Sequence, residues 1–307
     1  FFMLLFLSVP VSQGGFYRTE YASDLLPDEA DSQYHTNWVD SVLNSLSLEQ
    51  RIAQLLMIRI QTDQEQAYYE EKARLIQQYN IGGVAFFKGT PHRQLSYTNH
   101  LQSIVQTPLL VAMDAEWGPS MRLDSTLQFP RQMSLGAIRG EGLIYDMGFE
   151  IGKQLKRLGV HINFAPVVDV NNNPSNPVIN FRSFGESSQN VACKGSAYMR
   201  GMQDAGIIAC AKHFPGHGDT DADSHHTLPV MKHSLKEIRQ IHLHPFQELI
   251  SQGVDAIMIA HLEVPALESR SKLASSLSVN VVRQLLQEEM GFGGLIITDA
   301  LDMKGVS

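Results

Sequence analysis

Seven short, almost wholly apolar segments recur along the chain, and they constrain its fold more than any other feature. They span residues 53–60, 81–87, 108–114, 161–170, 207–214, 256–264 and 294–301. None alternates apolar with polar residues, which is typical of parallel strands buried on both faces. Amphipathic stretches that predict helices lie between them, at residues 65–80, 141–159, 234–253 and 280–291. This alternation predicts an α/β fold built on a parallel sheet.

Polar residues lie at or just after the carboxyl ends of most of these segments. They are Asp114, Asp169, Lys212, His213, His261 and Asp299. Polar groups at many strand ends are typical of a (β/α)8 barrel of the TIM type, whereas a doubly wound sheet gathers them at one switch point. Seven strands are one too few for that barrel, and the sequence stops soon after Asp299. We therefore expect a (β/α)8 barrel that is truncated before its eighth strand.

The first residues read FFMLLFLSVPV, an apolar run too short to span a bilayer but long enough for the core of a signal peptide. Small and polar residues follow, as in cleavage regions, and no charged segment precedes the run. We expect residues 1–15 to be a partial signal peptide, 16–37 a linker and 38–307 the barrel. The protein would then be secreted or periplasmic, without stable membrane insertion. The alternative is a buried N-terminal strand or helix.

Composition excludes several classes of function. Acidic residues number 32 and basic residues 24, so no broad basic surface for nucleic acid is expected. Cys193 and Cys210 are too few for a disulfide framework or a zinc quartet. We expect neither a cofactor nor a metal ion. Histidine is more informative, because five of the 12 histidines lie between His213 and His233.

The segment KHFPGHGDTDADSHHTLP, residues 212–229, concentrates the reactive side chains. Its Pro-Gly and His-Gly pairs end the strand and predict a polar loop above the barrel mouth, where loops often carry function. Asp223 and His225 are two residues apart, so in an extended segment they point to the same side. An aspartate bonded to one imidazole nitrogen raises the His pKa and leaves the other nitrogen for acid–base chemistry. The alternative is a solvated acidic loop with incidental histidines.

Three further patterns carry weaker signals. Asp299 ends an apolar strand and could act as nucleophile, general base or metal ligand, or merely cap a following helix. Asp114, with Arg122 further on, could bind sugar hydroxyls. Arg182 lies between aromatic residues in NFRSFG, residues 180–185, a pattern found more often in packed loops than in sites.

Taken together, these motifs resemble glycoside hydrolase family 3, in its β-N-acetylglucosaminidase branch. KHFPGHG-D-T-x-x-DSH-x-x-LP is similar to the family signature, and ITDALDM at 297–303 is similar to its nucleophile strand. NFRSFG and the spacing of Asp114 to Arg122 also agree. The resemblance covers residues 38–307, which would form the catalytic barrel.

The resemblance implies a role for each residue. Asp299 would be the nucleophile, and His225, held by Asp223, the general acid/base. The subsite for N-acetylglucosamine would consist of Asp114, Arg122, Arg182, Lys212 and His213. The implied enzyme is a retaining exo-β-N-acetylglucosaminidase that removes terminal N-acetylglucosamine from peptidoglycan-derived or chitin-like oligosaccharides.

One loop departs from the family pattern. Members commonly read DQEGGRVQR after the third strand, whereas residues 114–122 read DAEWGPSMR, so Pro119 replaces an arginine and Trp117 adds bulk. Two other functions stay open. A family 3 β-glucosidase is one, although such enzymes usually take the acid/base from a later domain. A metal-dependent barrel hydrolase is the other, with ligands from His213, His217, Asp223, His225 and Asp299.

Overall fold

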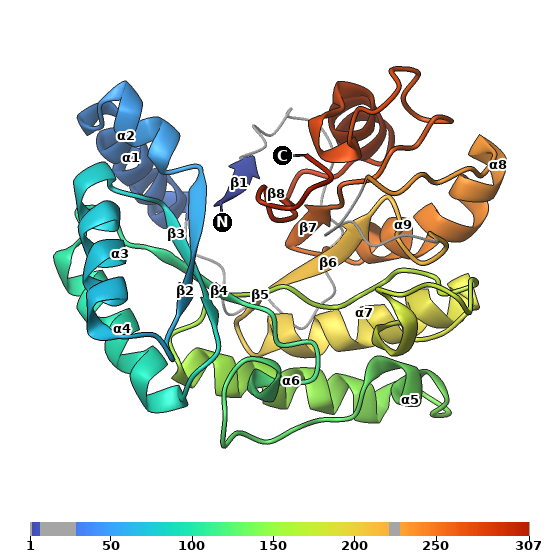
Figure 1. Cartoon of the computed structure of the whole chain (residues 1–307), viewed down its shortest axis with the longest axis horizontal. Helices are drawn as coiled ribbons and strands as arrows, with labels where there is room; N and C mark the ends of the chain where they lie inside the picture. Colours follow the sequence, from blue (N-terminus) through green and yellow to red (C-terminus); the bar gives the residue numbers. More distant parts are fainter. Residues whose placement is uncertain (1, 7–28, 221–227, 307) are drawn as a thin grey trace.

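The computed structural model describes residues 2–6, 29–220 and 228–306. Seven parallel strands form one curled sheet in chain order (Figure 1). They are β2 (Leu56–Gln61), β3 (Gly83–Phe87), β4 (Leu110–Met113), β5 (Ile162–Asn163), β6 (Ile208–Phe214), β7 (Ala256–Ile259) and β8 (Leu295–Thr298). Each falls in one of the seven apolar segments, so the predicted parallel α/β sheet is confirmed.

Segment 161–170 departs most from its predicted strand. Only Ile162 and Asn163 form β5, and the rest of the segment is irregular. Val167 nevertheless bridges to Lys212 on β6, and Val168 N–H donates to the Lys212 carbonyl at 2.8 Å. The segment therefore still runs beside β6, and it carries Asp169 to the end of the sheet where β6 ends.

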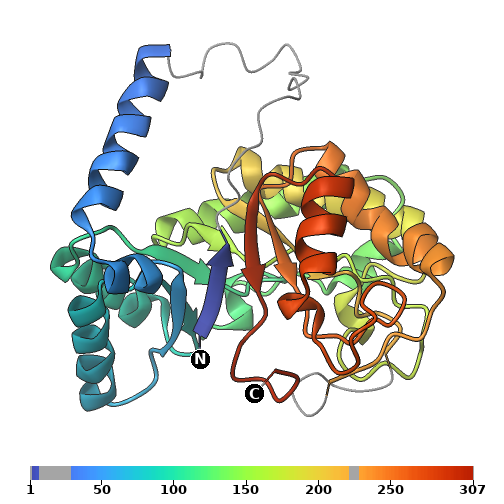
Figure 2. The same ribbon diagram turned by 90° about the horizontal axis from the view of Figure 1, so that it is seen from above.

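A short N-terminal strand, β1 (Phe2–Phe6), pairs antiparallel with both β2 and β8. Figure 2 shows it between the two, and the strand order closes on itself. The edges of β2 and β8 are therefore not open, because their backbone groups find partners in this apolar run. The (β/α)8 barrel is not confirmed, since the eighth place is held by an antiparallel strand. The strand matches the N-terminal alternative, while cleavage of residues 1–15 stays a prediction.

The helices lie around the outside of the sheet (Figure 1). They are α1 (Glu29–Ser45), α2 (Leu48–Ala53), α3 (Gln66–Tyr79), α4 (Pro91–Ile104), α5 (Gln132–Gly136), α6 (Gly142–Arg157), α7 (Ser188–Asp204), α8 (Leu235–Glu237) and α9 (Leu243–Ser251), with π-helical turns η3 (Ile238–His242) and η5 (Asn280–Glu289) and short 3-10 turns η1 (Pro119–Met121), η2 (Asn180–Arg182) and η4 (Ser275–Leu277). The four predicted helical stretches are confirmed. The linker expected at 16–37 stays a prediction, and α1, which begins at Glu29, projects from the body in Figure 2.

Two apolar layers hold the fold together. Side chains of the strands and of the surrounding helices form one large cluster, which includes Val84, Val111, Ile151 and Phe246. A second cluster fills the inside of the curled sheet with one or two residues from each parallel strand. It consists of Met57, Ala85, Ala112, Ile162, Phe164, Cys210, Ala256, Met258 and Ile297. Burial on both faces explains why the strand segments are continuously apolar.

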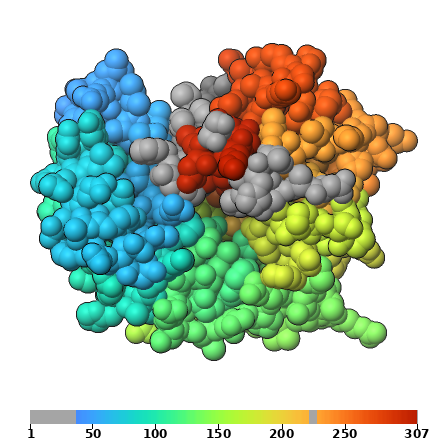
Figure 3. Space-filling model, in the orientation of Figure 1, coloured from blue at the N-terminus to red at the C-terminus, as the bar shows by residue number. Residues whose placement is uncertain are grey.

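The last strand and the residues after it lie at the middle of the molecule. In Figure 3 this C-terminal part, in red, separates the blue N-terminal side from the orange side. Asp299, in this part of the chain, lines one pocket together with Asp114 and Arg122 from the first half of the chain. Among the described residues, no helix is both long and apolar enough to cross a membrane.

Candidate active site

A pocket of about 290 Å³ collects side chains from the ends of several strands and the loops that follow them. Its lining consists of Phe87, Asp114, Met121, Arg122, Phe164, Val178, Arg182, Lys212, His213, His217, Met258, Asp299 and Ala300. Six of the eight predicted site residues are in this lining. The other two, Asp223 and His225, lie outside the described residues.

Asp114 directly follows β4 and holds two cations. Lys212 Nζ donates to its Oδ1 at 2.7 Å, and Arg122 Nη2 donates to its Oδ2 at 2.5 Å. Burial by itself raises the pKa of the Asp114 carboxyl, but Lys212 and Arg122 outweigh burial and hold the pKa well below its usual range. Asp114 is therefore a fixed anion, with both oxygens oriented before any ligand arrives.

Glu116 is a central residue that the sequence analysis did not assign. It is fully buried and forms a bidentate pair with Arg182, with N···O distances of 2.7 and 3.0 Å. Lys212 Nζ lies 2.9 Å from the same carboxylate. Burial raises the pKa of Glu116, but the opposite effect of Arg182 and Lys212 is larger and brings the pKa down to about 2. Its position two residues after Asp114 was the available signal, since i and i+2 share a side in an extended segment.

Lys212 connects these two carboxylates at the end of β6. Only 2% of its surface is exposed. Burial lowers the pKa of the ammonium, whereas Asp114 and Glu116 raise it, and the net shift is upward. The pairing register of β6 with β7 shifts between Ala211 and Phe214, a bulge of the kind that redirects side chains near sites. The buried ammonium is therefore fully charged and spans both anions.

His213 follows Lys212 and is oriented by a buried carboxylate. Its Nδ1 lies 2.7 Å from Asp169 Oδ2, and its Nε2 lies 3.4 Å from Arg182 Nη2. Because arginine can only donate, Nε2 is the acceptor and Nδ1 carries the proton. Asp169 also accepts from the backbone N–H groups of His213 and His217. Burial raises the pKa of Asp169, but His213 and these hydrogen bonds bring it below its usual value.

Asp299 comes immediately after β8 and is half-buried. Its backbone N–H donates to the Ile259 carbonyl at 2.8 Å, and its Oδ1 accepts from the Ala300 N–H at 2.8 Å. In the described residues after Asp299 no helix begins, so the helix-cap alternative is not realised. The Asp299 carboxylate lines the pocket. Within the described chain, no ammonium or guanidinium group forms an ion pair with it.

The family departure near β4 leaves the pocket lining intact. Trp117 and Pro119 are not among the lining residues. The Arg131 guanidinium stacks 3.4 Å above the Trp117 ring and 4.8 Å from the centre of the Phe181 ring. The bulk of Trp117 is thus taken up by a cation–π stack beside the site. Asp114 and Arg122 keep their positions in the pocket.

The metal-ligand set weighed in the sequence analysis does not converge in the described part of the chain. His213 and His217 pack edge to face with ring centres 6.2 Å apart, and His213 binds Asp169. A compact group of possible metal ligands does occur within residues 29–220 and 228–306, but it consists of Asp219, His233 and His242. None of these three lines the pocket.

Comparison with known proteins agrees with this geometry. Residues 47–307 match the glycosyl hydrolase family 3 N terminal domain. The chain is 40% identical over 261 residues to a β-hexosaminidase A of Pseudoalteromonas piscicida, a match that covers 77% of this chain and 44% of that protein. It is 34% identical over 237 residues to a β-hexosaminidase of Thiobacillus denitrificans, with 74% and 65% covered.

A solved structure gives the same result. The family 3 β-N-acetylglucosaminidase of Paenibacillus sp. superposes with a TM-score of 0.80 at 39% identity, over 86% of this chain and 51% of that one. A β-glucoside phosphorylase, BglX, superposes with a TM-score of 0.85 at 26% identity, over 93% and 53%. This chain belongs to glycosyl hydrolase family 3, which confirms the resemblance found in its motifs. It spans about half the length of several of these relatives.

Proposed function

We propose that this chain carries the catalytic site of a retaining exo-β-N-acetylglucosaminidase. Its substrates would be peptidoglycan-derived or chitin-like oligosaccharides with a terminal N-acetylglucosamine. The observation that carries the proposal is one pocket in which Asp299 faces a network of paired charges. Such a network presents oriented hydrogen-bonding groups with little net charge, which suits a neutral polyol. Similarity to proteins named β-hexosaminidase supports the choice of sugar.

The charges of the pocket also decide which group can act as the acid. A retaining glycosidase needs a nucleophile and a proton donor for the leaving oxygen. Asp114, Glu116 and Asp169 all have pKa values below their usual range, so none is protonated near neutral pH. With Asp299 as nucleophile, no described carboxyl of the site is left as a proton donor. This favours His225, oriented by Asp223, as the acid/base.

The reaction then follows two steps. The Asp299 carboxylate attacks the anomeric carbon while the His225 imidazolium gives its proton to the leaving oxygen, which forms a glycosyl-enzyme. His225, now neutral, takes a proton from water, and that water releases the sugar with retention of configuration. Asp114, Arg122, Arg182, Lys212 and His213 would hold the sugar during both steps. A (β/α)8-type barrel is the architecture that we propose for the site.

Substrate choice tests the proposal directly. We expect nitrophenyl N-acetylglucosaminide to be cleaved at least about 10-fold faster than the glucoside, because one unpaired buried polar group costs about 1–3 kcal/mol. Each assay is run with and without inorganic phosphate, since one structural neighbour is named a phosphorylase. Equal rates on both sugars would overturn the proposed specificity. A strict need for phosphate would replace hydrolysis by phosphorolysis.

His225→Ala tests the acid/base role. Cleavage of a natural disaccharide should slow by about 10²–10⁴-fold, the usual contribution of general acid–base catalysis. With a nitrophenolate leaving group, the first step should change little and the glycosyl-enzyme should accumulate, which gives a burst. Azide should speed the slow phase, because it attacks without a base. A near-normal rate on the natural disaccharide would remove His225 from the mechanism.

We also propose export of the protein, from the apolar run at its start. Sequencing the N-terminus of the protein isolated from its own cells would test this. Cleavage near residues 12–15 supports export. An N-terminus that retains Phe2–Phe6 would instead favour a permanent role of β1 in the sheet.

A further inference from the structure

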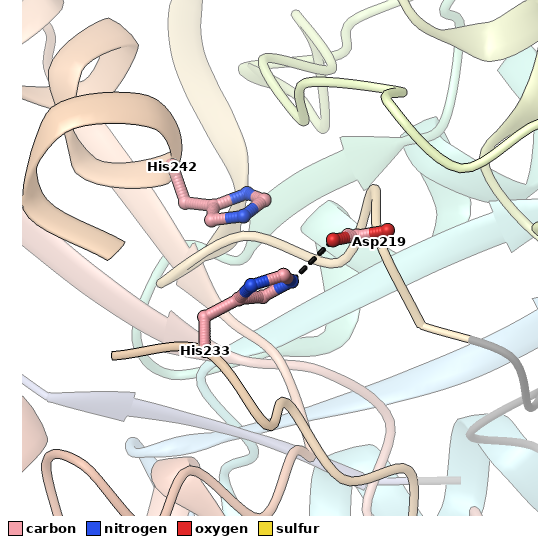
Figure 4. Close-up of side chains that lie close together, drawn as sticks. All are labelled: Asp219, His233 and His242. Carbon is pink, nitrogen blue, oxygen red and sulfur yellow. Dashed lines mark ion pairs between the residues drawn. The ribbon is translucent and has the colours of Figure 1, made fainter. Parts of the chain in front are cut away.

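A compact group of metal-ligating side chains lies outside the pocket just described. Asp219, His233 and His242 each offer one ligand atom, and these atoms all lie within 4.8 Å of one another. Figure 4 shows the carboxylate and the two rings turned toward a common space. Asp219 follows β6, His233 precedes α8, and His242 ends η3. Three separate parts of the chain therefore bring their side chains to one point.

His242 is the unusual member of this group. Only 1% of its surface is exposed, and among the described residues neither ring nitrogen has a hydrogen-bond partner. Buried polar atoms without partners are rare and costly, and a bound ion or water is a common explanation. Gly216 packs closely against His242, since a Cβ built on that glycine would lie 2.9 Å from the Cβ of His242. The two ring nitrogens are therefore buried in a crowded part of the fold.

The chemical character of the group suits a cation. Its ligand atoms are one carboxylate oxygen and two imidazole nitrogens. Neutral imidazole is the form that binds metals. Asp219 already forms an ion pair with His233 through Nε2, and the two histidine rings lie 5.3 Å apart. An ion between the three groups would bind one of the two His242 ring nitrogens and the Asp219 carboxylate.

We propose that Asp219, His233 and His242 bind one divalent transition-metal ion of the zinc type. Two imidazole nitrogens and one carboxylate oxygen are typical zinc ligands, with a water in the fourth position. Bonds of about 2.0–2.2 Å require ligand atoms about 3.4 Å apart in a tetrahedron, which small side-chain rotations from the present arrangement provide. Magnesium and calcium are less suitable, since they prefer oxygen ligands.

Neighbouring groups fit this role. Nδ1 of His233 faces the Glu237 carboxylate at 3.9 Å, a charge contact longer than a hydrogen bond. Glu237 is itself fixed by hydrogen bonds to Ser234. Asp219 and His233 also flank residues 221–227, the part of the chain that contains Asp223 and His225. The ion would tie together the two ends of that segment and join them to η3.

Zinc titration of the metal-free chain tests the proposal. The full chain is treated with EDTA, dialysed, and titrated with zinc chloride in a calorimeter. We expect one tight equivalent per chain, and a rise in Tm of about 5 °C at a zinc concentration 100 times Kd. Cobalt(II) in place of zinc should give the intense visible bands of a tetrahedral site.

Two variants and one control assign the ion to this group. His242→Phe keeps the ring volume in a buried place and removes the two ring nitrogens, so it should fold and lose zinc affinity at least about 100-fold. Asp219→Asn should also weaken binding. His244→Gln is the matched control, because His244 is only two residues away on α9 but contacts Gln189 instead. It should bind zinc as the original chain does.

The outcomes show whether zinc binds at this group or elsewhere on the chain. If His242→Phe still binds one equivalent with unchanged affinity, the ion lies elsewhere and the proposal is wrong. If the original chain binds no zinc, the Asp219–His233 pair beside His242 accounts for the group, and the proposal is again wrong. The readout is binding and not turnover, so failure of the proposed glycosidase activity leaves this test unaffected.

Discussion

The buried charges around the pocket compensate one another almost group by group. Asp114 is held by Arg122 and Lys212, and Glu116 by Arg182 and Lys212. Taking such charges out of water is expensive, and removal of one partner leaves the other uncompensated. The network is therefore rigid. Under the proposed function it would orient donors and acceptors for the sugar before binding, which limits the loss of entropy on association.

Glu116→Gln tests this compensation. The substitution keeps the shape but leaves Arg182 and Lys212 without one buried anion, so the free energy of unfolding should fall by about 3 kcal/mol. Urea denaturation measures the change. Glu288→Gln is the control, because its pair with Arg283 is exposed and such pairs contribute less than about 1 kcal/mol. Equal effects of both variants would mean that Glu116 is not a structural counter-ion.

Asp299→Asn tests the nucleophile. Turnover of nitrophenyl N-acetylglucosaminide should fall by about 10⁴-fold or more, the scale at which loss of one member of a catalytic unit acts. Sugar binding should persist, since the polar network is unchanged. Asp302→Asn, three residues further on and exposed, should keep normal activity. Full activity of the Asp299 variant would remove this residue from the mechanism.

At the scale of elements, the end of β6 matters most. Lys212 and His213 lie in the bulge, and the chain then turns through Pro215 to Gly218 toward Asp219. The turn packs tightly on the segment after β5: a Cβ at Gly218 would lie 2.0 Å from the Val170 carbonyl oxygen. Only glycine permits this approach, which holds the end of β6 beside Asp169.

Gly218→Ala should therefore displace the backbone at residue 218 or at Val170, because the added Cβ would meet backbone atoms. Overpacking of this kind costs about 1–3 kcal/mol of stability, and displacement of the adjoining residues should lower kcat/KM. Thermal unfolding and aryl-glycoside kinetics measure both effects. Gly142→Ala is the control, because nothing lies within 4 Å of its added Cβ at the start of α6. That variant should be as stable as the original chain or slightly more stable.

For the whole molecule, the curled sheet gathers three carboxylates and their cationic partners at one end. The carboxylates are Asp114, which is partly buried, and the fully buried Glu116 and Asp169, and all three have lowered pKa values. Each is stabilised as an anion by groups that the folded chain alone brings near. The stability of the fold is therefore coupled to pH through its own site.

This coupling predicts acid sensitivity. The pKa of Glu116 is about 2 in the folded chain against 4.5 ordinarily, so between these values the unfolded state binds more protons. The contribution of Glu116 is complete above about pH 4.5 and is lost as pH falls toward 2, about 3 kcal/mol in all. Denaturation measured from about pH 5 down to 2.5 should show this loss, and Glu116→Gln should flatten it. An unchanged slope in the variant would contradict the shift.

The parallel α/β sheet, the family and most of the pocket could be predicted from the sequence alone. Strands buried on both faces require continuous apolar runs, so the pattern was local and readable in each segment. The residues that carry chemistry follow those runs directly, as Asp114 and Asp299 do. Position along a parallel strand fixes the edge of the sheet to which a side chain belongs, so these two could be assigned to one site.

Which charged side chains pair with one another could be seen only in the tertiary structure. Glu116 and its partner Arg182 are 66 residues apart in the sequence, and Asp169 and its partner His213 are 44 apart. No local sequence pattern predicts a contact at such separations. The apolar start of the chain is compatible with a signal peptide or with a strand. In the folded chain it forms β1 because it pairs with the edges of β2 and β8. The grouping of Asp219, His233 and His242 likewise depends on how η3 packs against the end of β6, because a ligand set is a matter of distance in space and not of spacing in sequence.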